Sequence, residues 1–259
     1  MQVTQNAKND PQDRSELNSS LGTRFLQNKK ETFLKVGEVH HMPDFLMNLV
    51  SPEDQWMYIT SNGALTAGRK NADNALFPYY TQDKLIDLAE TTGCVTSIWK
   101  EGTSKAKSQN WKPFSKNRES FDHIERNVYK SLEGNEVIFE EINTHLGLQF
   151  SYLWTFSPHY GFARYAELTN IGSEGVELHM LDGLQNLIPY GLDQNFMNKF
   201  SNLSDAYKKS ELLAPENVGV YYLSSIPSDR AEPSEGLRST LVWSLNYQFY
   251  PILMMFWKV

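Results

Sequence analysis

Short runs of aromatic and β-branched residues recur along most of this chain, and each run is bounded by residues that favour turns. Aromatic and β-branched side chains favour strands, whereas Gly, Pro, Asn and Asp interrupt them. In residues 162–169, for example, Phe162, Arg164, Ala166 and Leu168 fall on one face of an extended chain. The pattern predicts ten strands, at 56–60, 64–68, 95–99, 124–129, 136–142, 148–156, 162–168, 176–181, 218–224 and 237–243.

Two segments interrupt the strand pattern and favour helices. The first is 81–90, with Thr81 as its N-cap and Asp83 in its first turn. The second is 192–212, which Pro215 would end. Apolar residues occur there at helical spacing with mostly polar residues between them, at Leu192, Phe196, Phe200, Leu203 and Tyr207.

The number and spacing of the strands predict the fold class. Hairpin turns are expected at 133–135 and at 170–175, between neighbouring strands. Many short strands at close spacing are typical of an all-β protein in which antiparallel sheets pack face to face. We therefore expect a mainly β sandwich over residues 33–244, with one or two short helices.

The two ends of the chain differ from this central region. Residues 1–32 are polar and contain few large apolar groups, so we expect a flexible N-terminal arm. The tail, 245–259, is dense in apolar residues and is atypical of the chain before it. It is either a last strand or the truncated end of a longer protein. Truncation is favoured, because an abrupt apolar end would leave an uncovered edge or patch.

The composition argues against several classes of protein. A net charge of -7 argues against nucleic acid as a partner, because phosphate binding needs a basic surface. The one cysteine, Cys94, allows no intramolecular disulfide, and we expect it to be a buried thiol. No segment resembles a signal peptide or reaches the ~18 apolar residues of a membrane span. We therefore expect a cytoplasmic protein without a membrane partner.

Residues 61–84 are the part of the chain least typical of a core. This stretch combines glycines with polar and aromatic side chains, among them Arg69, Asp73, Tyr79, Tyr80 and Asp83. Arg and Asp hydrogen-bond sugar hydroxyls well, and aromatic faces stack on the C–H side of a pyranose. The stretch therefore predicts a carbohydrate-binding site. The alternative is a surface loop in which Arg69 and Asp73 form a structural ion pair.

A second polar segment, 181–191, is expected at the end of a strand and before a turn. Gln185 and Asn186 are candidates for contact with a ligand. Asp182 is a third candidate, although an Asp at this place commonly accepts backbone N–H groups within the turn. The sequence is compatible with both roles for this segment, contact with a ligand and a structural turn.

The sequence contains no recognisable catalytic or metal-binding pattern. Glu140 and Glu141 are adjacent, so on a strand they face opposite sides and cannot act together on one glycosidic bond. The histidines lack the spacing of a metal site. His145 or His179 is chemically suited to act as an acid or base in a mutarotase-like reaction, but a structural role is commoner. We therefore expect no catalytic residue, no metal and no cofactor.

Four segments together resemble the N-terminal portion of cellobiose-phosphorylase-like proteins, which are large bacterial carbohydrate-active enzymes. The resemblance covers roughly residues 45–244, and none of its motifs is itself a catalytic signature. The segments that carry it are 61–69, 75–84, 137–143 and 181–189.

The resemblance implies a galactose-mutarotase-like β-supersandwich. In that family a helical linker, an (α/α)6 barrel and a C-terminal β cap follow this domain, and the barrel carries most of the phosphorolysis machinery. The sequence ends before such a barrel, so no catalytic residue of the family is expected in it. The family's N-terminal domain makes dimer contacts and helps to wall the sugar site. The implied partners are therefore a glucoside or oligosaccharide, the missing barrel and a second copy of the chain.

Three hypotheses for the function follow. The leading one is a non-catalytic, carbohydrate-associated domain of a glycoside phosphorylase or hydrolase that acts on glucosides, and such a fragment would be inactive alone. The first alternative is a stand-alone mutarotase or epimerase acting on free sugars, which needs a His and a carboxylate on one concave face. The second alternative is a β-sandwich that serves protein interactions.

Overall fold

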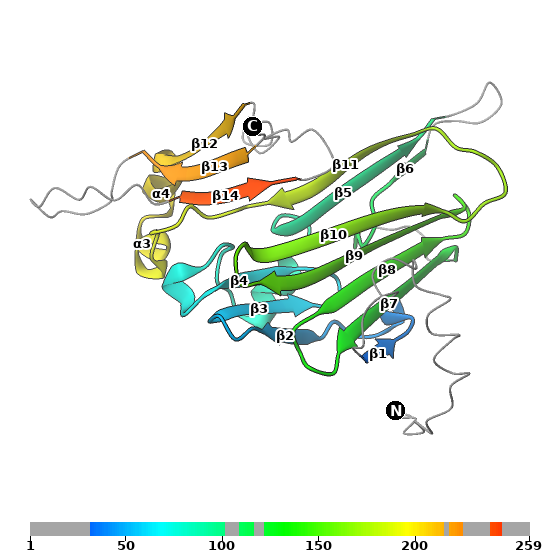
Figure 1. The fold of residues 1–259 in the computed structure, drawn as a ribbon, viewed down its shortest axis with the longest axis horizontal. Coiled ribbons are helices and arrows are strands. Elements are labelled where there is room, and N and C mark those ends of the chain that lie inside the picture. Colours follow the sequence, from blue (N-terminus) through cyan, green and yellow to red (C-terminus); the bar gives the residue numbers. More distant parts are fainter. Residues whose placement is uncertain (1–31, 102–108, 117–121, 215–217, 225–238, 245–259) are drawn as a thin grey trace, which may run out of the picture. The chain divides into compact units, whose positions relative to one another are not determined.

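The computed structural model describes residues 32–101, 109–116, 122–214, 218–224 and 239–244 (Figure 1). Of these residues, 50% are in strands and 14% in helices, and every strand pair is antiparallel. The predicted mainly β class with a few short helices is therefore confirmed. The predicted arm, apart from Thr32, and the predicted tail lie outside the described residues.

The chain forms two compact units, and each is built from two separate segments. The first unit comprises Met1–Val39 and Ser120–Gly175 and contains one five-stranded sheet of order β1-β7-β8-β9-β10. A strand from the start of the described chain therefore pairs with the second segment. The strands are β1 Phe33–Val36, β7 Ile124–Ser131, β8 Val137–Asn143, β9 Leu148–Ser157 and β10 Gly161–Asn170.

The second unit comprises His40–Glu119 and Val176–Val259 and contains three sheets of three strands each. The first sheet has the order β2-β3-β4, with β2 Leu46–Val50, β3 Gln55–Thr60 and β4 Leu65–Arg69. The second has the order β11-β5-β6, with β11 Leu178–Gln185, β5 Gly93–Lys100 and β6 Gln109–Trp111. The third has the order β12-β13-β14, with β12 Lys208–Leu213, β13 Val218–Leu223 and β14 Ser239–Trp243.

The helices of the described chain are all short. The two 3-10 helices are η1 Val39–His41 and η2 Ala72–Asn74. The α-helices, all in the second unit, are α2 Gln82–Asp87, α3 Gln194–Lys199 and α4 Ser201–Tyr207. Because each spans only one or two turns, these helices depend on packing rather than on their own propensity.

Both faces of the central strands β8 and β9 are buried, and Ile138 and Leu153 form a cluster with Phe33 and Tyr129 on the face opposite to an aromatic-rich one. The side chains of the aromatic-rich face are at most 2% exposed, and the rings of Phe139 and Tyr152 stack with centroids 4.9 Å apart. Burying each large side chain of this kind contributes about 1.5–3 kcal/mol. The members of this face are Val137, Phe139, Phe150, Tyr152 and Trp154.

All ten predicted strands are present, with ends shifted by a few residues; 237 and 238 lie outside the described part of the chain. The predicted hairpin turn at 133–135 is also confirmed, since it joins the paired strands β7 and β8. Strands β1, β2, β6 and β12 were not predicted.

The predicted helix at 192–212 is wrong in its extent. The chain forms α3 and α4 instead, with a break at Phe200, whose backbone has φ -134° and ψ 47°. The last residues, from Lys208 on, form strand β12, which pairs with β13 over its full length. Pairing with β13, the next strand along the chain, overrode the local helical spacing.

The other predicted helix, at 81–90, ends earlier than expected. It is α2, in which Thr81 occupies the N-cap position without a capping hydrogen bond from its side chain. The predicted hairpin turn at 170–175 is wrong, because β10 pairs with β9 whereas β11 pairs with β5. The amide nitrogens of Ile171 and Gly172 instead donate to the carbonyl oxygen of Gly147.

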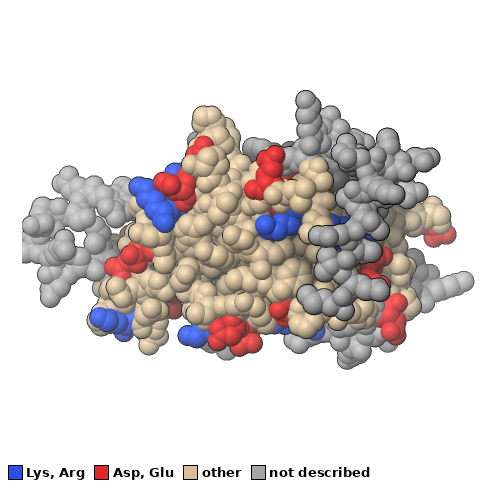
Figure 2. Space-filling view, turned by 90° about the horizontal axis from the view of Figure 1, so that it is seen from below, with Lys and Arg blue, Asp and Glu red and all other residues tan. Residues whose placement is uncertain are grey.

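The described surface shows little segregation of charge in the view of Figure 2. Uncharged side chains form most of this face, and Lys and Arg side chains lie near acidic ones in small groups. Within the residues described, the helices include none with the length and hydropathy needed to cross a membrane.

Candidate functional site

The predicted sugar-binding stretch begins with a buried strand rather than an exposed loop. Ala64, Leu65, Thr66 and Ala67 are all 0% exposed, and β4 pairs with β3 as one arm of a hairpin. The expectation that little of this stretch is typical of a core is therefore wrong for its first half. Only from Arg69 onward does the chain reach the surface.

After η2, the chain folds back along the free side of β4. The amide of Leu76 donates to the carbonyl of Ala67 at 2.7 Å, and Ala75 forms a bridge with Gly68. The Thr66 hydroxyl donates to the Phe77 carbonyl at 3.4 Å. This return places Tyr79 beside the strand pair β3–β4, where its ring contacts that of Trp56 in β3.

Three aromatic rings meet on the exposed face of the sheet β2-β3-β4. The ring centroid of Trp56 is 5.8 Å from that of Tyr58 and 5.7 Å from that of Tyr79, which meets it edge-on at 86°. Tyr58 is 37% and Tyr79 38% exposed. The exposed Asn48 lies directly opposite Tyr58 in register and adds an amide. We call Asn48, Trp56, Tyr58 and Tyr79 the aromatic face.

Gly68 makes this aromatic contact sterically feasible. It lies opposite Trp56 in register, and a Cβ at Gly68 would come within 2.7 Å of Trp56 Cζ2 and of the Ala75 Cα. The same Cβ would lie 2.6 Å from the Asn74 carbonyl oxygen. Because two of these three neighbours are backbone atoms, the site cannot accommodate a side chain without moving the returning segment.

Gly68→Ala is therefore expected to destabilise the protein and disturb the aromatic face together. Overpacking of this kind costs about 1–3 kcal/mol of unfolding free energy. Urea denaturation measures that loss, and the indole N–H signal of Trp56 in an NMR spectrum reports the ring's surroundings. Gly175→Ala is the matched control, since a Cβ there meets nothing within 4 Å. Equal stability of the two variants would contradict the packing described.

The other predicted residues of this stretch are not gathered around Tyr79. Arg69 pairs with Gln55, so it follows the opposite side-chain parity from Gly68 and Trp56. Asp73 accepts a hydrogen bond at 3.2 Å from the amide of Gln194, at the start of α3. The alternative that Arg69 and Asp73 form an ion pair is wrong for the described structure.

Tyr80 and Asp83 follow Tyr79, the last member of the aromatic face, in the sequence. Tyr80 is half-buried. The exposed Asp83 accepts a hydrogen bond at 2.5 Å from the Thr81 hydroxyl, and this bond, with the Lys84 amide, lowers the pKa of its carboxyl group. Asp83 is therefore held as an anion in the first turn of α2, where the helix dipole favours it.

The strand at the second predicted segment extends further than expected, because β11 continues to Gln185. Asp182 lies within β11 and accepts a hydrogen bond at 2.6 Å from Thr96 on the neighbouring β5, so the suggested turn role for Asp182 is wrong. The Gln185 amide donates to the Glu90 carbonyl, and the Asn186 amide donates to the Thr92 hydroxyl, both at 2.9 Å. The Gln185 and Asn186 side chains therefore fasten β11 to the 90–92 segment.

The two predicted stretches are nevertheless joined through their backbones. The amide of Ile188 donates to the carbonyl of Leu76 at 2.7 Å, and Asp73 reaches Gln194 as described above. The Ile188 carbonyl in turn accepts from the Thr240 hydroxyl at 2.9 Å. The second segment therefore supports the strand-like return that carries Tyr79.

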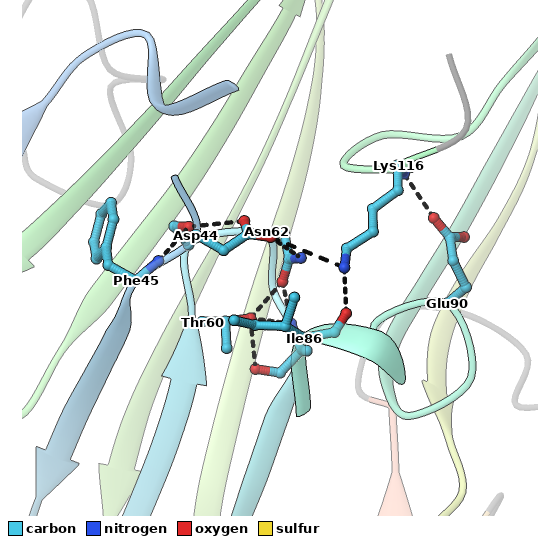
Figure 3. Close-up of polar contacts among 9 residues, drawn as sticks. Asp44, Phe45, Thr60, Asn62, Ile86, Glu90 and Lys116 are labelled. Carbon is cyan, nitrogen blue, oxygen red and sulfur yellow. Dashed lines mark hydrogen bonds and ion pairs between the residues drawn. The ribbon is translucent and has the colours of Figure 1, made fainter. Parts of the chain in front are cut away.

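A polar network fixes the turn between β3 and β4 (Figure 3). The Asp44 carboxylate accepts from the Ser61 hydroxyl and from the Asn62 amide, both at 3.2 Å, and its Oδ2 lies 3.9 Å from Lys116 Nζ. Lys116 Nζ also donates to the Ile86 carbonyl of α2. Its backbone amide donates to Glu90 at 2.7 Å. These polar groups bind one another, which makes the network a clamp between the hairpin and α2.

A second polar network lies on the first unit's sheet, opposite its aromatic core. The Glu140 carboxylate, 1% exposed, accepts from Asn127 at 2.9 Å, Tyr129 at 3.0 Å and Gln149 at 2.9 Å. Desolvation raises the pKa of the Glu140 carboxyl group, and the hydrogen bonds from Asn127 and Tyr129 partly offset the rise. Glu141 faces the other way and pairs with Arg126 at 2.7 Å. The predicted opposite orientation of the two carboxylates is confirmed.

The candidate histidines do not form a buried acid–base site. His179 Nε2 lies 2.8 Å from Glu101 Oε1, but the side chains are 66% and 55% exposed. The ring of His145 stacks on that of His123, with centroids 5.5 Å apart. Among the described residues, no group of three or more His, Cys, Asp or Glu side chains is arranged to hold a metal ion.

No protein-family model matches the chain, and no curated protein matches it. The fold and the aromatic face define the chain as a mainly β protein with antiparallel sheets and an exposed aromatic cluster. The resemblance to the N-terminal portion of cellobiose-phosphorylase-like proteins stays a prediction.

Proposed function

We propose that the second unit binds carbohydrate through the aromatic face. The observation that supports this proposal is the cluster of Trp56, Tyr58 and Tyr79, two of whose rings are more than a third exposed on an open sheet face. Aromatic rings stack on the apolar face of a sugar ring, while an amide such as that of Asn48 hydrogen-bonds its hydroxyl groups. A glucoside or oligosaccharide therefore matches both the apolar and the polar parts of the site.

We further propose that this chain is a non-catalytic part of a glycoside phosphorylase or hydrolase. The support is the resemblance of segments 61–69 and 75–84, which contain β4 and the return that carries Tyr79. In this proposal the helical barrel holds the catalytic residues, and the aromatic face contacts sugar units beside it. The stand-alone epimerase alternative has weaker support, because its His179–Glu101 pair is exposed at the surface.

Tyr79→Ala is expected to weaken sugar binding with little loss of stability. Removing one stacked ring costs about 0.5–1.5 kcal/mol, which corresponds to a roughly 2- to 10-fold rise in Kd. Calorimetric titration with cellobiose and longer glucans measures the change, and urea denaturation checks the stability. Tyr165→Ala is the matched control, since Tyr165 is a 52% exposed tyrosine in the first unit.

The same titration tests whether the aromatic face or another part of residues 61–84 binds the sugar. Arg69→Ala should leave the affinity unchanged, because Arg69 follows the opposite side-chain parity from Trp56 and Gly68. If Arg69→Ala weakens binding while Tyr79→Ala does not, the aromatic face is the wrong site. The carbohydrate proposal would then move to the exposed end of β4 at Arg69, because the rest of that side of the sheet is buried.

A further inference from the structure

A second exposed aromatic side chain of the second unit has polar partners on both sides. Trp99 lies in β5, the central strand of the sheet β11-β5-β6, and is 38% exposed. In register, His179 of β11 and Asn110 of β6 lie directly opposite it. Residues directly opposite in neighbouring antiparallel strands point to the same face with Cβ atoms about 4.5–5.5 Å apart. Trp99 is therefore flanked by an imidazole and an amide.

The imidazole on one side of Trp99 is already held in place. His179 Nε2 lies 2.8 Å from Glu101 Oε1, and the Glu101 amide donates to the Glu177 carbonyl at 3.3 Å, which extends the pairing of β5 with β11. The imidazole has a second ring nitrogen and the carboxylate a second oxygen, and both groups are mostly exposed. Hydrogen-bonding groups fixed beside an aromatic ring can meet hydroxyl groups without a large loss of side-chain entropy.

We propose that Trp99, His179, Glu101 and Asn110 form a second carbohydrate-binding site, which takes one pyranose ring of an oligosaccharide. The apolar C–H face of the sugar stacks on the indole. Hydroxyl groups at the ring edge exchange hydrogen bonds with the imidazole, the carboxylate and the amide. The inference goes beyond the proposed function, because it uses a different sheet and different residues and shares with it only the class of ligand.

The charges around Trp99 argue for a neutral ligand. Glu101 and Glu177 lie at the same end of the sheet, and both are exposed. A phosphate group at this place would be repelled by the two carboxylates, which disfavours nucleotides and sugar phosphates. A neutral pyranose meets no such repulsion and can use a carboxylate as a hydrogen-bond acceptor.

The indole N–H signals of the tryptophans provide a test that separates the two sites. The chain has six tryptophans. Three of them report on different places, Trp56 on the aromatic face, Trp99 on the second site, and Trp243 as a matched control with the same 38% exposure as Trp99. Trp243 lies opposite Val218, away from the imidazole and amide that flank Trp99. Each signal is assigned from the spectrum of the corresponding Trp→Phe variant.

Titration of the full chain with cellotetraose should shift the Trp99 signal saturably and leave the Trp243 signal unchanged. In His179→Ala and in Glu101→Gln, the Kd read from Trp99 should rise roughly 3- to 10-fold, as expected for losing one hydrogen bond to a charged or polar group. The Kd read from Trp56 should stay constant in both variants.

The outcomes distinguish this inference from the proposed function. A Trp99 signal that moves no more than that of Trp243, while Trp56 responds, overturns the second site and leaves the aromatic face standing. If the Trp99 signal responds and the Trp56 signal does not, the aromatic face is overturned and the second site is left standing. A Trp99 signal that shifts with adenosine but not with cellotetraose also overturns the proposal, because it indicates stacking of any flat ring.

Discussion

Arg126→Met is expected to lower the free energy of unfolding by about 3–5 kcal/mol, the range found when one partner of a buried ion pair is removed. Arg126 Nε lies 2.7 Å from Glu141 Oε2, and their side chains are only 7% and 0% exposed. Both residues lie on the β7–β8 pair, directly opposite in register. Methionine keeps much of the side-chain volume but leaves the Glu141 carboxylate buried without this cation.

The double variant Arg126→Met/Glu141→Leu separates the charge effect from packing. Because it removes both charges and fills the space with apolar groups, its stability should lie close to that of the natural protein. Urea denaturation followed by circular dichroism measures the natural protein, the two single variants and the double variant, and the four values together give the coupling free energy of the pair. If Arg126→Met is as stable as the natural protein, the ion pair is not buried as described.

Glu140→Ala is expected to cost several kcal/mol, because it removes the acceptor of three buried hydrogen bonds. Asn127, Tyr129 and Gln149 each donate to this carboxylate, and an unsatisfied buried polar group costs about 1–3 kcal/mol. The loss of unfolding free energy is partly offset, because the variant no longer buries the charge of Glu140. Thermal or urea unfolding at neutral pH measures the net effect.

Glu140→Gln is expected to change how stability depends on pH. The pKa of Glu140 in the folded protein is raised above the ordinary value of 4.5 by desolvation. Its contribution to stability is therefore fully present below the unfolded-state pKa and is lost as the pH rises through the folded-state pKa, by about 1.4 kcal/mol for each unit between the two. The glutamine variant lacks this loss.

Relative to the natural protein, Glu140→Gln should therefore gain stability as the pH rises from below 4.5. Unfolding free energies measured at a series of pH values test the sign. Glu133→Gln, at an exposed position in the same sheet's hairpin turn, is the control and should not change the pH profile. A glutamine variant that loses stability relative to the natural protein as the pH rises would contradict the raised pKa of the buried Glu140 carboxyl group.

The strands were predictable because their signal is local. Alternation of side chains and turn residues such as Gly134 are properties of a few consecutive residues, and they located ten strands. Strand β12 was missed because Leu203 and Tyr207 continue a helical spacing up to its first residue. Its strand form depends on pairing with β13, which local spacing does not reveal.

The candidate site was predictable only in part for the same reason. Tyr79 attracted notice because it stands among polar residues, whereas Trp56 and Tyr58 alternate within a strand and resemble ordinary core positions. Their meeting with Tyr79 depends on Gly68 and on the return of the chain along β4. The turn role suggested for Asp182 was wrong because its partner, Thr96, is 86 residues away in the sequence.

Calorimetric titration of the purified chain with glucose, cellobiose and longer glucans, with and without phosphate, tests the central claim most directly. We predict saturable binding of the oligosaccharides that is independent of phosphate and is weakened by Tyr79→Ala. Millimolar affinity, about -4 kcal/mol, would be sufficient. Absence of saturable binding to every sugar, by a chain shown to be folded, would contradict the claim that the second unit carries its own carbohydrate site.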